Sequence, residues 1–102
     1  MDIVDIRDKI SSGRFEFSRH AFKRVIERDV TTNEIKQLGQ NAEIVENYPA
    51  DKYSPSCLIL GFSIKGRPLH IQLCYISENS LKIITIYEPD RELWIDFRVR
   101  RC

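Results

Sequence analysis

Residues 17–28 gather side chains suited to binding an anion or transferring a proton. In a helix that starts after Ser18, the side chains of His20, Arg24 and Glu27 lie on one side, at spacings of four and three residues. The apolar side chains lie on the other side, which we expect to face a core: Ala21, Phe22, Val25 and Ile26. An imidazole beside guanidinium groups suits acid–base work at a phosphate. A solvated charged helix face has the same spacing, so both interpretations stay open.

A second candidate site depends on how three expected strands pair. Alternating apolar residues predict strands over 57–65, 68–77 and 81–87, joined by two-residue loops at Lys65-Gly66 and Glu78-Asn79. This register pairs apolar residues across one sheet face: Leu58 with Leu73, Leu60 with Ile71, Phe62 with Leu69, Leu73 with Ile84, and Ile71 with Ile86. We therefore expect this face to form the core together with the apolar side of the helix.

The opposite face of the same sheet then carries polar residues. His70 lies between Gly61 and Tyr87, and the next row places Gln72 beside Thr85. Glycine beside histidine leaves room for a ligand above the sheet, and these side chains suit proton transfer and hydrogen bonding at a phosphate. An ordinary solvent-facing side of an antiparallel sheet has the same polar character. On either interpretation, we expect His70 to face outward.

The remaining pattern predicts an α+β fold in one domain of 102 residues. A capping box, Thr31-x-x-Glu34, begins the last of three expected helices. Further segments are predicted along the chain: helices at about 2–39 with an extended link at 14–17, an antiparallel sheet of four strands at about 42–88 that starts with 42–48, a short C-terminal helix from 90 to 97, and a basic tail to 102. We expect the helices to pack on one face of the four-stranded sheet.

Composition excludes several classes of protein. The formal net charge of +1 does not mark a nucleic-acid binder, although Arg98, Arg100 and Arg101 cluster near the C-terminus. The acidic start does not match a signal peptide, and no segment has the length of apolar sequence that spans a membrane. Cys57 and Cys74 are expected opposite each other on neighbouring strands as free thiols, in a cytoplasmic protein without metal or cofactor.

The two polar groups conflict in space. If the helix packs its apolar side on the core face of the sheet, His20 points away from His70. The two imidazoles share a site only if the helix lies at an edge of the sheet, so that its N-terminus reaches round. The sequence leaves this question open.

Several motifs together resemble the bacterial family of unknown function DUF4258. The resemblance extends over roughly residues 15–95 and rests on these segments: Phe17-Ser18-Arg19-His20-Ala21, Arg24, Glu27-Arg28, Thr31-Thr32-Asn33-Glu34-Ile35, Ile44-Val45-Glu46-Asn47-Tyr48-Pro49, Leu60-Gly61, Gly66-Arg67-Pro68-Leu69-His70, Ile84-Thr85-Ile86-Tyr87-Glu88-Pro89-Asp90 and Trp94. The family is similar to RelE and MqsR toxins, within a wider group of barnase-like ribonucleases, and its members are often encoded beside MqsA-like antitoxins with a zinc finger.

The resemblance implies a RelE/barnase-like fold and a toxin-like endoribonuclease that cleaves RNA by acid–base catalysis without a metal ion. Carried onto this sequence, the catalytic candidates are His70, Tyr87 and His20, and the substrate-binding candidates are Arg24, Arg67, Arg28, Gln72 and Thr85. The implied partners are RNA and a cognate antitoxin, for a monomer or a homodimer. The alternative is a catalytically silent module of the same fold that binds protein or nucleic acid.

Overall fold

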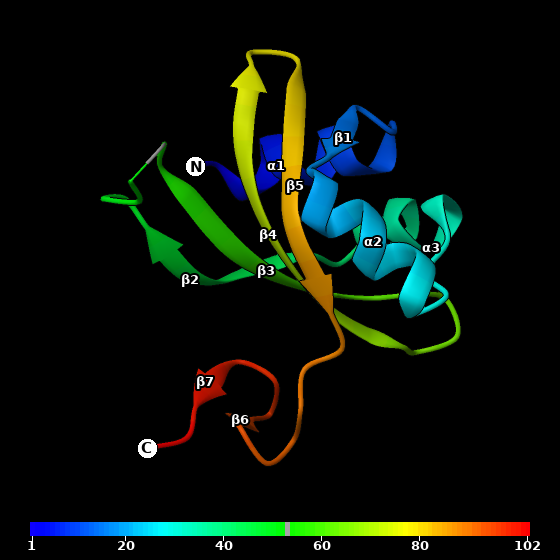
Figure 1. Cartoon of the computed structure of the whole chain (residues 1–102), viewed down its shortest axis with the longest axis vertical. Coiled ribbons are helices and arrows are strands. Elements are labelled where there is room, and N and C mark those ends of the chain that lie inside the picture. Colours follow the sequence, from blue (N-terminus) through cyan, green and yellow to red (C-terminus); the bar gives the residue numbers. More distant parts are fainter. Residues whose placement is uncertain (53) are drawn as a thin grey trace.

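The computed structural model describes residues 1–52 and 54–102 and has an α+β architecture (Figure 1). Helices and strands follow in this order: α1 (Ile3–Ser11), β1 (Phe15–Phe17), α2 (Arg19–Glu27), α3 (Thr32–Leu38), β2 (Glu43–Tyr48), β3 (Ser56–Phe62), β4 (Pro68–Ser77), β5 (Ser80–Tyr87), β6 (Trp94–Ile95) and β7 (Val99–Arg100). None of the helices in the described residues has the length and apolar character needed to cross a membrane.

The helices begin where local capping satisfies their first backbone N–H groups. Ser18 accepts a hydrogen bond from the Ala21 amide at 3.0 Å, which caps α2. Thr31 and Glu34 form the predicted capping box at the start of α3. At the end of α1, Gly13 has a positive φ of 75°, a conformation that glycine adopts without a steric penalty. The predicted helix start after Ser18 and the predicted capping box at Thr31 are confirmed.

The main sheet has five strands in the order β1-β5-β4-β3-β2, not the four antiparallel strands that we expected. Residues 14–17 were expected to form only a link, but Phe15–Phe17 pairs in parallel with residues 81–83 of β5. The Phe15 and Phe17 rings contact each other edge to face and pack on the core, so this short strand is held by its side chains as well as by its hydrogen bonds. The added strand makes the sheet mixed.

The β3–β4 register differs by one residue from the predicted one. Ile59 pairs with Ile71 and Leu60 pairs with His70, so Leu58, Leu60 and Phe62 lie on the opposite face from Leu69, Ile71 and Leu73. The cause is the loop, in which the Ser63 amide donates to the Arg67 carbonyl and three residues, not two, make the turn. Gly66 takes the left-handed conformation, with φ of 84°, that such a three-residue loop requires.

The β4–β5 register is as predicted at both ends and shifted between them. Ser77 pairs with Ser80, and Ile71 pairs with Ile86. Irregularities near Ile76 and Ile84 shift the pairs in between, so that Leu73 pairs with Ile83 in place of Ile84. The predicted Cys57–Cys74 pair is also wrong, because Cys57 lies opposite Leu73 and Cys74 lies opposite Ser56 and Lys82. Both thiols are free and buried.

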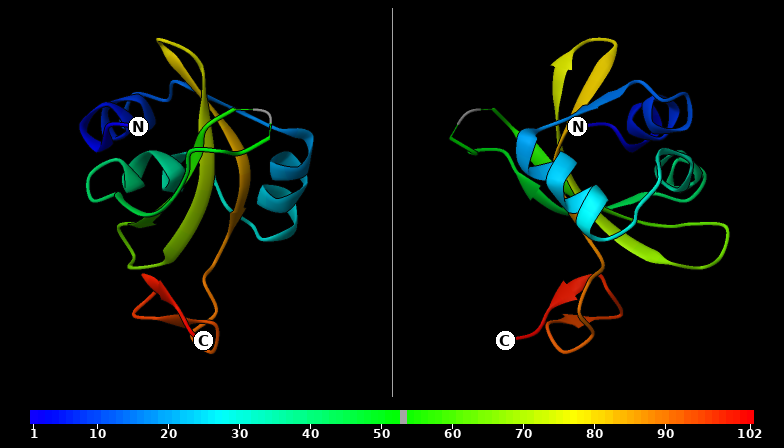
Figure 2. Two further views of the ribbon diagram at one scale, coloured as in Figure 1. Left: turned by 90° about the vertical axis from the view of Figure 1, so that its left-hand side faces the viewer. Right: turned by 45° about the vertical axis from the view of Figure 1, so that its right-hand side comes forward.

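Helices α1 and α3 cover one face of the sheet, and α2 lies on the other side of the β4–β5 hairpin (Figure 2). The core contains residues from α1, α3 and the inner face of the sheet: Ile6, Ile10, Ile35, Leu38, Ile59, Leu69, Ile71, Leu73, Leu81, Ile83 and Ile86. Ala21 and Val25 of α2 join this core. Phe22 and Ile26 are 56% and 65% exposed, so the expectation that they face the core is wrong.

The C-terminal segment forms a hairpin in place of the predicted helix over 90–97. Trp94 pairs with Arg100, and Ile95 pairs with Val99. Asp96 and Phe97 both have positive φ angles, of 52° and 61°, which is the backbone of a tight turn with right-handed strand twist. This hairpin packs below the end of the sheet, far from the N-terminus (Figure 1).

Gly61 of β3 lies directly against Leu38 of α3. A Cβ atom at Gly61 would lie 2.5 Å from Leu38 Cγ. We expect Gly61→Ala to lower the free energy of unfolding by about 1–3 kcal/mol, the usual range for an overpacked core, measured by urea denaturation. In a Leu38→Ala background the contacts with Leu38 Cγ and Cδ2 are removed and only the one with Cβ, at 2.7 Å, is left, so the same substitution should then cost less. An equal loss in both backgrounds would contradict this packing.

Candidate functional site

The face of the sheet opposite α1 and α3, here called the second face, carries the candidate site. Its strand register forms one row of Glu43, Leu60, His70 and Tyr87 across four strands. A neighbouring row contains Glu46, Leu58, Gln72 and Thr85. The predicted pairings of His70 with Tyr87 and of Gln72 with Thr85 are therefore confirmed. Gly61 lies on the core face, so the expected space beside His70 is wrong.

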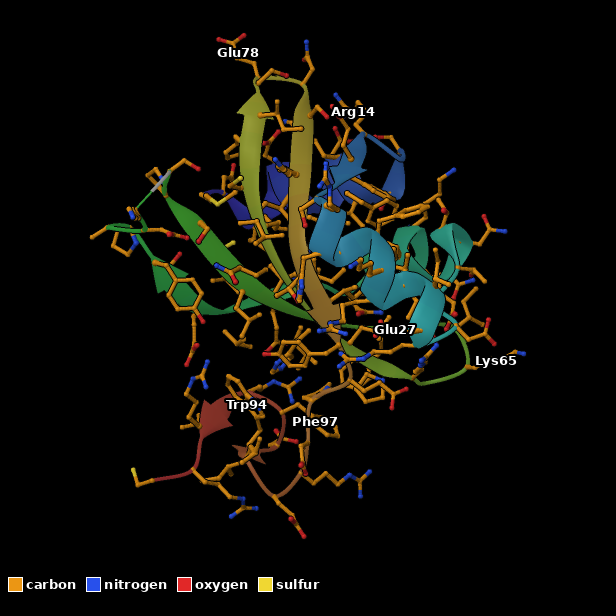
Figure 3. The ribbon with its side chains drawn as sticks, in the orientation of Figure 1. Arg14, Glu27, Lys65, Glu78, Trp94 and Phe97 are labelled. Carbon is orange, nitrogen blue, oxygen red and sulfur yellow. The ribbon has the colours of Figure 1, made fainter. Side chains whose placement is uncertain are left out.

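His70 is fully buried, contrary to the expectation that it faces outward. The C-terminal hairpin covers it, and Trp94 and Phe97 of this hairpin point toward the end of the sheet (Figure 3). The His70 ring contacts the Trp94 ring edge to face, with 4.5 Å between ring centroids. Its Nε2 atom lies 2.6 Å from the Phe97 carbonyl oxygen, and its Nδ1 atom lies 3.2 Å from the Tyr87 hydroxyl.

These partners fix the protonation state of His70. Because a carbonyl oxygen only accepts hydrogen bonds, Nε2 carries the proton and Nδ1 accepts from the Tyr87 hydroxyl. Burial lowers the pKa of His70 from its ordinary value of 6.5, against the opposing effect of the Phe97 hydrogen bond. Burial also raises the pKa of Tyr87. At neutral pH the pair is therefore an uncharged imidazole beside a protonated phenol.

Two arginines of the C-terminal hairpin tie it to β2. Arg98 forms an ion pair with Glu43, with Nε 2.5 Å from the carboxylate, and Arg100 pairs with Glu46 at 2.9 Å. The Arg100 guanidinium also lies over the Trp94 ring, 4.6 Å from its centroid. The hydrogen bond to Glu46 raises the pKa of Arg100 further above its ordinary value. The segment that was expected to be a basic tail is thus largely a hairpin held against β2 by these ion pairs.

A cavity of about 530 Å³ opens where the hairpin meets α2 and the end of β5. Its lining residues are Arg28, Arg67, Tyr87, Glu88, Asp90, Leu93, Trp94 and Arg100. Arg28 anchors itself by donating from Nη1 to the Ile86 carbonyl at 3.1 Å. Within residues 1–52 and 54–102, no carboxylate forms an ion pair with Arg28. Its remaining N–H groups and its full charge are therefore available to an anion in this cavity.

Arg67 lines the same cavity, but its guanidinium is occupied by contacts within the protein. It forms ion pairs with Glu88 and Glu34, and its guanidinium donates to the backbone carbonyls of Arg28 at 2.7 Å and Asp29 at 3.1 Å. The hydrogen bond to Glu88 raises the pKa of Arg67. These contacts hold the start of β4 against the end of α2, so Arg67 positions Arg28 and has little capacity left for a phosphate.

Helix α2 lies along the edge of β5, where the Ser18 hydroxyl donates to the Ile84 carbonyl at 2.8 Å. The cavity is reached from the C-terminal end of this helix, by Arg28, the residue that follows Glu27. His20 is exposed on the first turn and is not among the residues that enclose His70. The helix has the edge position that a shared site requires, but it does not bring the two imidazoles together. Arg24 forms an ion pair with Glu27 at 2.5 Å and does not line the cavity either.

A family model described as a domain of unknown function, DUF4258, matches residues 17–88. The chain belongs to the DUF4258 family. The match contains α2, α3 and the four long strands, and it ends just before the C-terminal hairpin. No curated protein and no solved structure matches the chain.

Sequence reasoning missed several residues of the second face of this DUF4258 protein. Trp94 and Phe97 enclose His70, and Arg100 lines the cavity, yet no periodic pattern links the C-terminal segment to the sheet. Asp51 lies between β2 and β3, and its carboxylate accepts a hydrogen bond from Ser56 at 2.7 Å. Among the described residues, no group of three or more His, Cys, Asp and Glu side chains is placed to hold a metal ion.

The buried His70 predicts a pH dependence of stability. Because its pKa is lowered in the folded state, the unfolded chain takes up the proton first. The full stability is present above the unfolded value of 6.5 and is lost as the pH falls toward the folded pKa. We expect the free energy of unfolding to decrease between about pH 7 and pH 5, above the range where carboxylates titrate, as measured by urea denaturation.

The chain offers a matched control, because it contains two histidines. His70→Gln retains an N–H donor for the Phe97 carbonyl but does not titrate, so it should abolish the decrease. His20→Ala removes the exposed imidazole and should leave the decrease unchanged. If the decrease in the free energy of unfolding persists in His70→Gln and disappears in His20→Ala, the titrating group is His20. This result would contradict the buried state of His70.

Proposed function

We propose that this DUF4258 protein is a small toxin-like endoribonuclease that cleaves RNA by acid–base catalysis. The observation that carries the proposal is the cavity lined by Arg28, Arg100 and Tyr87. The Tyr87 hydroxyl connects this cavity to the buried imidazole of His70. Cations and a phenol around an open cavity are suited to a phosphodiester. The resemblance to RelE-like toxins supports the same reaction.

Arg28 is the main phosphate ligand in this proposal. Its backbone hydrogen bond to Ile86 fixes the direction of the guanidinium, and no carboxylate in the described part of the chain neutralises it. Arg100 contributes a second positive charge on the opposite wall, although its pairing with Glu46 reduces its share. Fixed guanidinium groups stabilise the negative charge that develops on a phosphate during cleavage.

Tyr87 and His70 act together as the base. The phenolic oxygen takes the proton from the ribose 2′-hydroxyl while the phenolic proton moves to Nδ1 of His70, which is neutral and accepts a hydrogen bond in the resting state. The 2′-oxygen then bonds to phosphorus, and the 5′-oxygen leaves and takes a proton from water. The products are a 2′,3′-cyclic phosphate and a 5′-hydroxyl. His70 thus contributes to the chemistry without contacting RNA.

A second function has one observation in its favour. His70 is enclosed and His20 is exposed at the other end of α2, so no imidazole touches the cavity directly. A module that binds RNA or protein without cleaving it would need no more than the arginines and Tyr87. The two functions differ in whether RNA is cut once it is bound.

The proposed partner is a cognate antitoxin, MqsA-like with a zinc finger, acting on this monomer or homodimer in the cytoplasm. The outer side of the C-terminal hairpin offers it an apolar surface, since Leu93, Ile95 and Val99 are 62%, 48% and 60% exposed. Leu93 also lines the cavity. A protein bound on this surface would therefore lie next to the proposed active site.

Cleavage of a 5′-labelled single-stranded RNA by the purified chain, in the presence of EDTA, tests the proposal. Tyr87→Phe breaks the path to His70 and should lower the cleavage rate by about 10²–10⁴-fold, the range for general acid–base groups. Arg28→Ala should lower it by about 10²–10³-fold, as for the loss of one group that stabilises developing charge.

Arg19→Ala is the matched control for Arg28→Ala. It removes an arginine from the same helix that is exposed and does not line the cavity, so the cleavage rate should be unchanged. Equal effects of the two substitutions would indicate only a general loss of positive charge. RNA that is bound but never cut by the wild-type chain would favour the binding module, and an absence of binding would reject both functions.

A further inference from the structure

A second cavity on the same face, of about 620 Å³, has a different chemical character. It is lined by Tyr48, Pro49, Ala50, Asp51, Gln72 and Arg100. Arg100 belongs to this cavity and to the proposed phosphate cavity, so the two adjoin. An aromatic ring, a proline and a guanidinium plane are surfaces on which a nucleobase stacks. This lining is suited to a base and not to a second phosphate.

Hydrogen bonds within the second cavity hold its polar groups in fixed positions. The Ser56 hydroxyl donates to Asp51 Oδ2 at 2.7 Å, and Gln72 Nε2 donates to the same hydroxyl at 3.2 Å. Ser56 is buried, with 3% of its surface exposed. Among the described residues, none donates to Asp51 Oδ1 or to Gln72 Oε1. These two oxygens are the acceptors that remain for a ligand.

We propose that this second cavity binds the guanine base of an RNA substrate, an inference that rests on the proposed function. A site with two acceptors requires a base with two N–H donors on the same edge. Guanine has such a pair, N1–H and the N2 amino group, on its Watson–Crick edge. Asp51 Oδ1 and Gln72 Oε1 accept these protons, and the base stacks on Tyr48 and on the guanidinium of Arg100.

The other bases lack this pair of donors. Adenine and cytosine each present one amino group next to a ring nitrogen that accepts, so one oxygen of the site would face a lone pair. Uracil presents one N–H between two carbonyls. A site that leaves buried polar groups unpaired, or faces acceptor to acceptor, rejects the wrong ligand strongly. The cavity therefore discriminates for guanine by repulsion as well as by attraction.

A third cavity, of about 550 Å³, continues the same surface beyond Gln72 and Asp51, which line it together with Ser18 and Lys82. Lys82 is exposed and forms no ion pair within the described part of the chain. It lies opposite Cys74, one row further along the sheet than Gln72. A strand of RNA with its scissile phosphate near Arg28 and a guanine near Asp51 would pass a further phosphate to Lys82.

The experiment measures binding of labelled single-stranded hexaribonucleotides that differ at one position, by fluorescence anisotropy at fixed salt concentration. One contains a single guanosine among uridines, and the others contain adenosine or inosine at that position. The wild-type chain should bind the guanosine oligonucleotide about 10–100-fold more tightly than the adenosine one. Inosine, which keeps N1–H and lacks the amino group, should fall between them.

Asp51→Asn replaces the carboxylate with an amide of the same shape and should reduce the guanosine preference to less than about threefold. Gln72→Met removes the other acceptor at similar volume, together with the amide hydrogen bonds to Ser56 and Asp51, and should also reduce the preference. Glu78→Gln at the tip of the β4–β5 hairpin (Figure 3) removes one negative charge far from the cavity and should leave the preference intact.

The outcomes separate the two proposals. If the wild-type chain binds all three oligonucleotides equally and Arg28→Ala weakens them all, the guanine site is wrong and the proposed function stands. If Asp51→Asn and Gln72→Met both fold, as judged by their circular dichroism, and both keep the preference, another part of the surface reads guanine. If the wild-type chain binds no oligonucleotide, the guanine site and the proposed function both fail.

Discussion

The enclosed imidazole of His70 is the constraint on which the second face of the sheet depends. A buried imidazole has two polar nitrogens, and an unpaired polar group in such a position costs about 1–3 kcal/mol. One nitrogen uses the Tyr87 hydroxyl from the neighbouring strand, and the other uses the Phe97 carbonyl from the C-terminal hairpin. Phe97 presents that carbonyl from a left-handed backbone conformation, which carries a steric penalty of its own outside glycine.

The position of the hairpin in turn defines the surface beside it. With the hairpin docked by His70, Arg98 and Arg100, its Trp94 and the neighbouring Leu93 become one wall of the cavity that contains Arg28, and the end of α2 becomes the other. Arg100 then stands between this cavity and the one that contains Asp51. The docked hairpin thus contributes to cavities that adjoin through Arg100, one with free positive charge and one with hydrogen-bond acceptors.

The sequence was sufficient to predict those features that depend on interactions between neighbouring residues. The caps at Ser18 and Thr31 depend on a few neighbouring residues, and both were predicted. The His70–Tyr87 pair was also predicted, because the expected two-residue loop is present and the two irregularities between the loop and this pair cancel each other. The β3–β4 register was not, because Gly66 is compatible with a loop of two or three residues and both registers bury leucines or isoleucines.

Other features depended on contacts that no short pattern reveals. Ile83 and Ile84 are both apolar, so the sequence does not indicate which of them the irregularity turns away from the core. The burial of His70 requires Trp94 and Phe97 to pack against the sheet after the strand ends at Pro89-Asp90. The segment after this break was expected to form a separate short helix. The pairing of His70 with Tyr87 was therefore predicted correctly, and the exposure of His70 was not.

The parallel pairing of β1 with β5 joins the N-terminal part of the chain to a strand that is made much later. Ser18 and Ile84, which bond at the junction of β1 and α2, are 66 residues apart in sequence. Contacts of such separation close a long loop before any of their stabilisation is gained, and they slow folding. During synthesis, the apolar side chains of β1 and of the inner side of α2 therefore have no β5 to pack against until that strand has been made. The growing chain exposes an apolar surface over most of its synthesis, which makes this protein a candidate for chaperone binding at its N-terminal third.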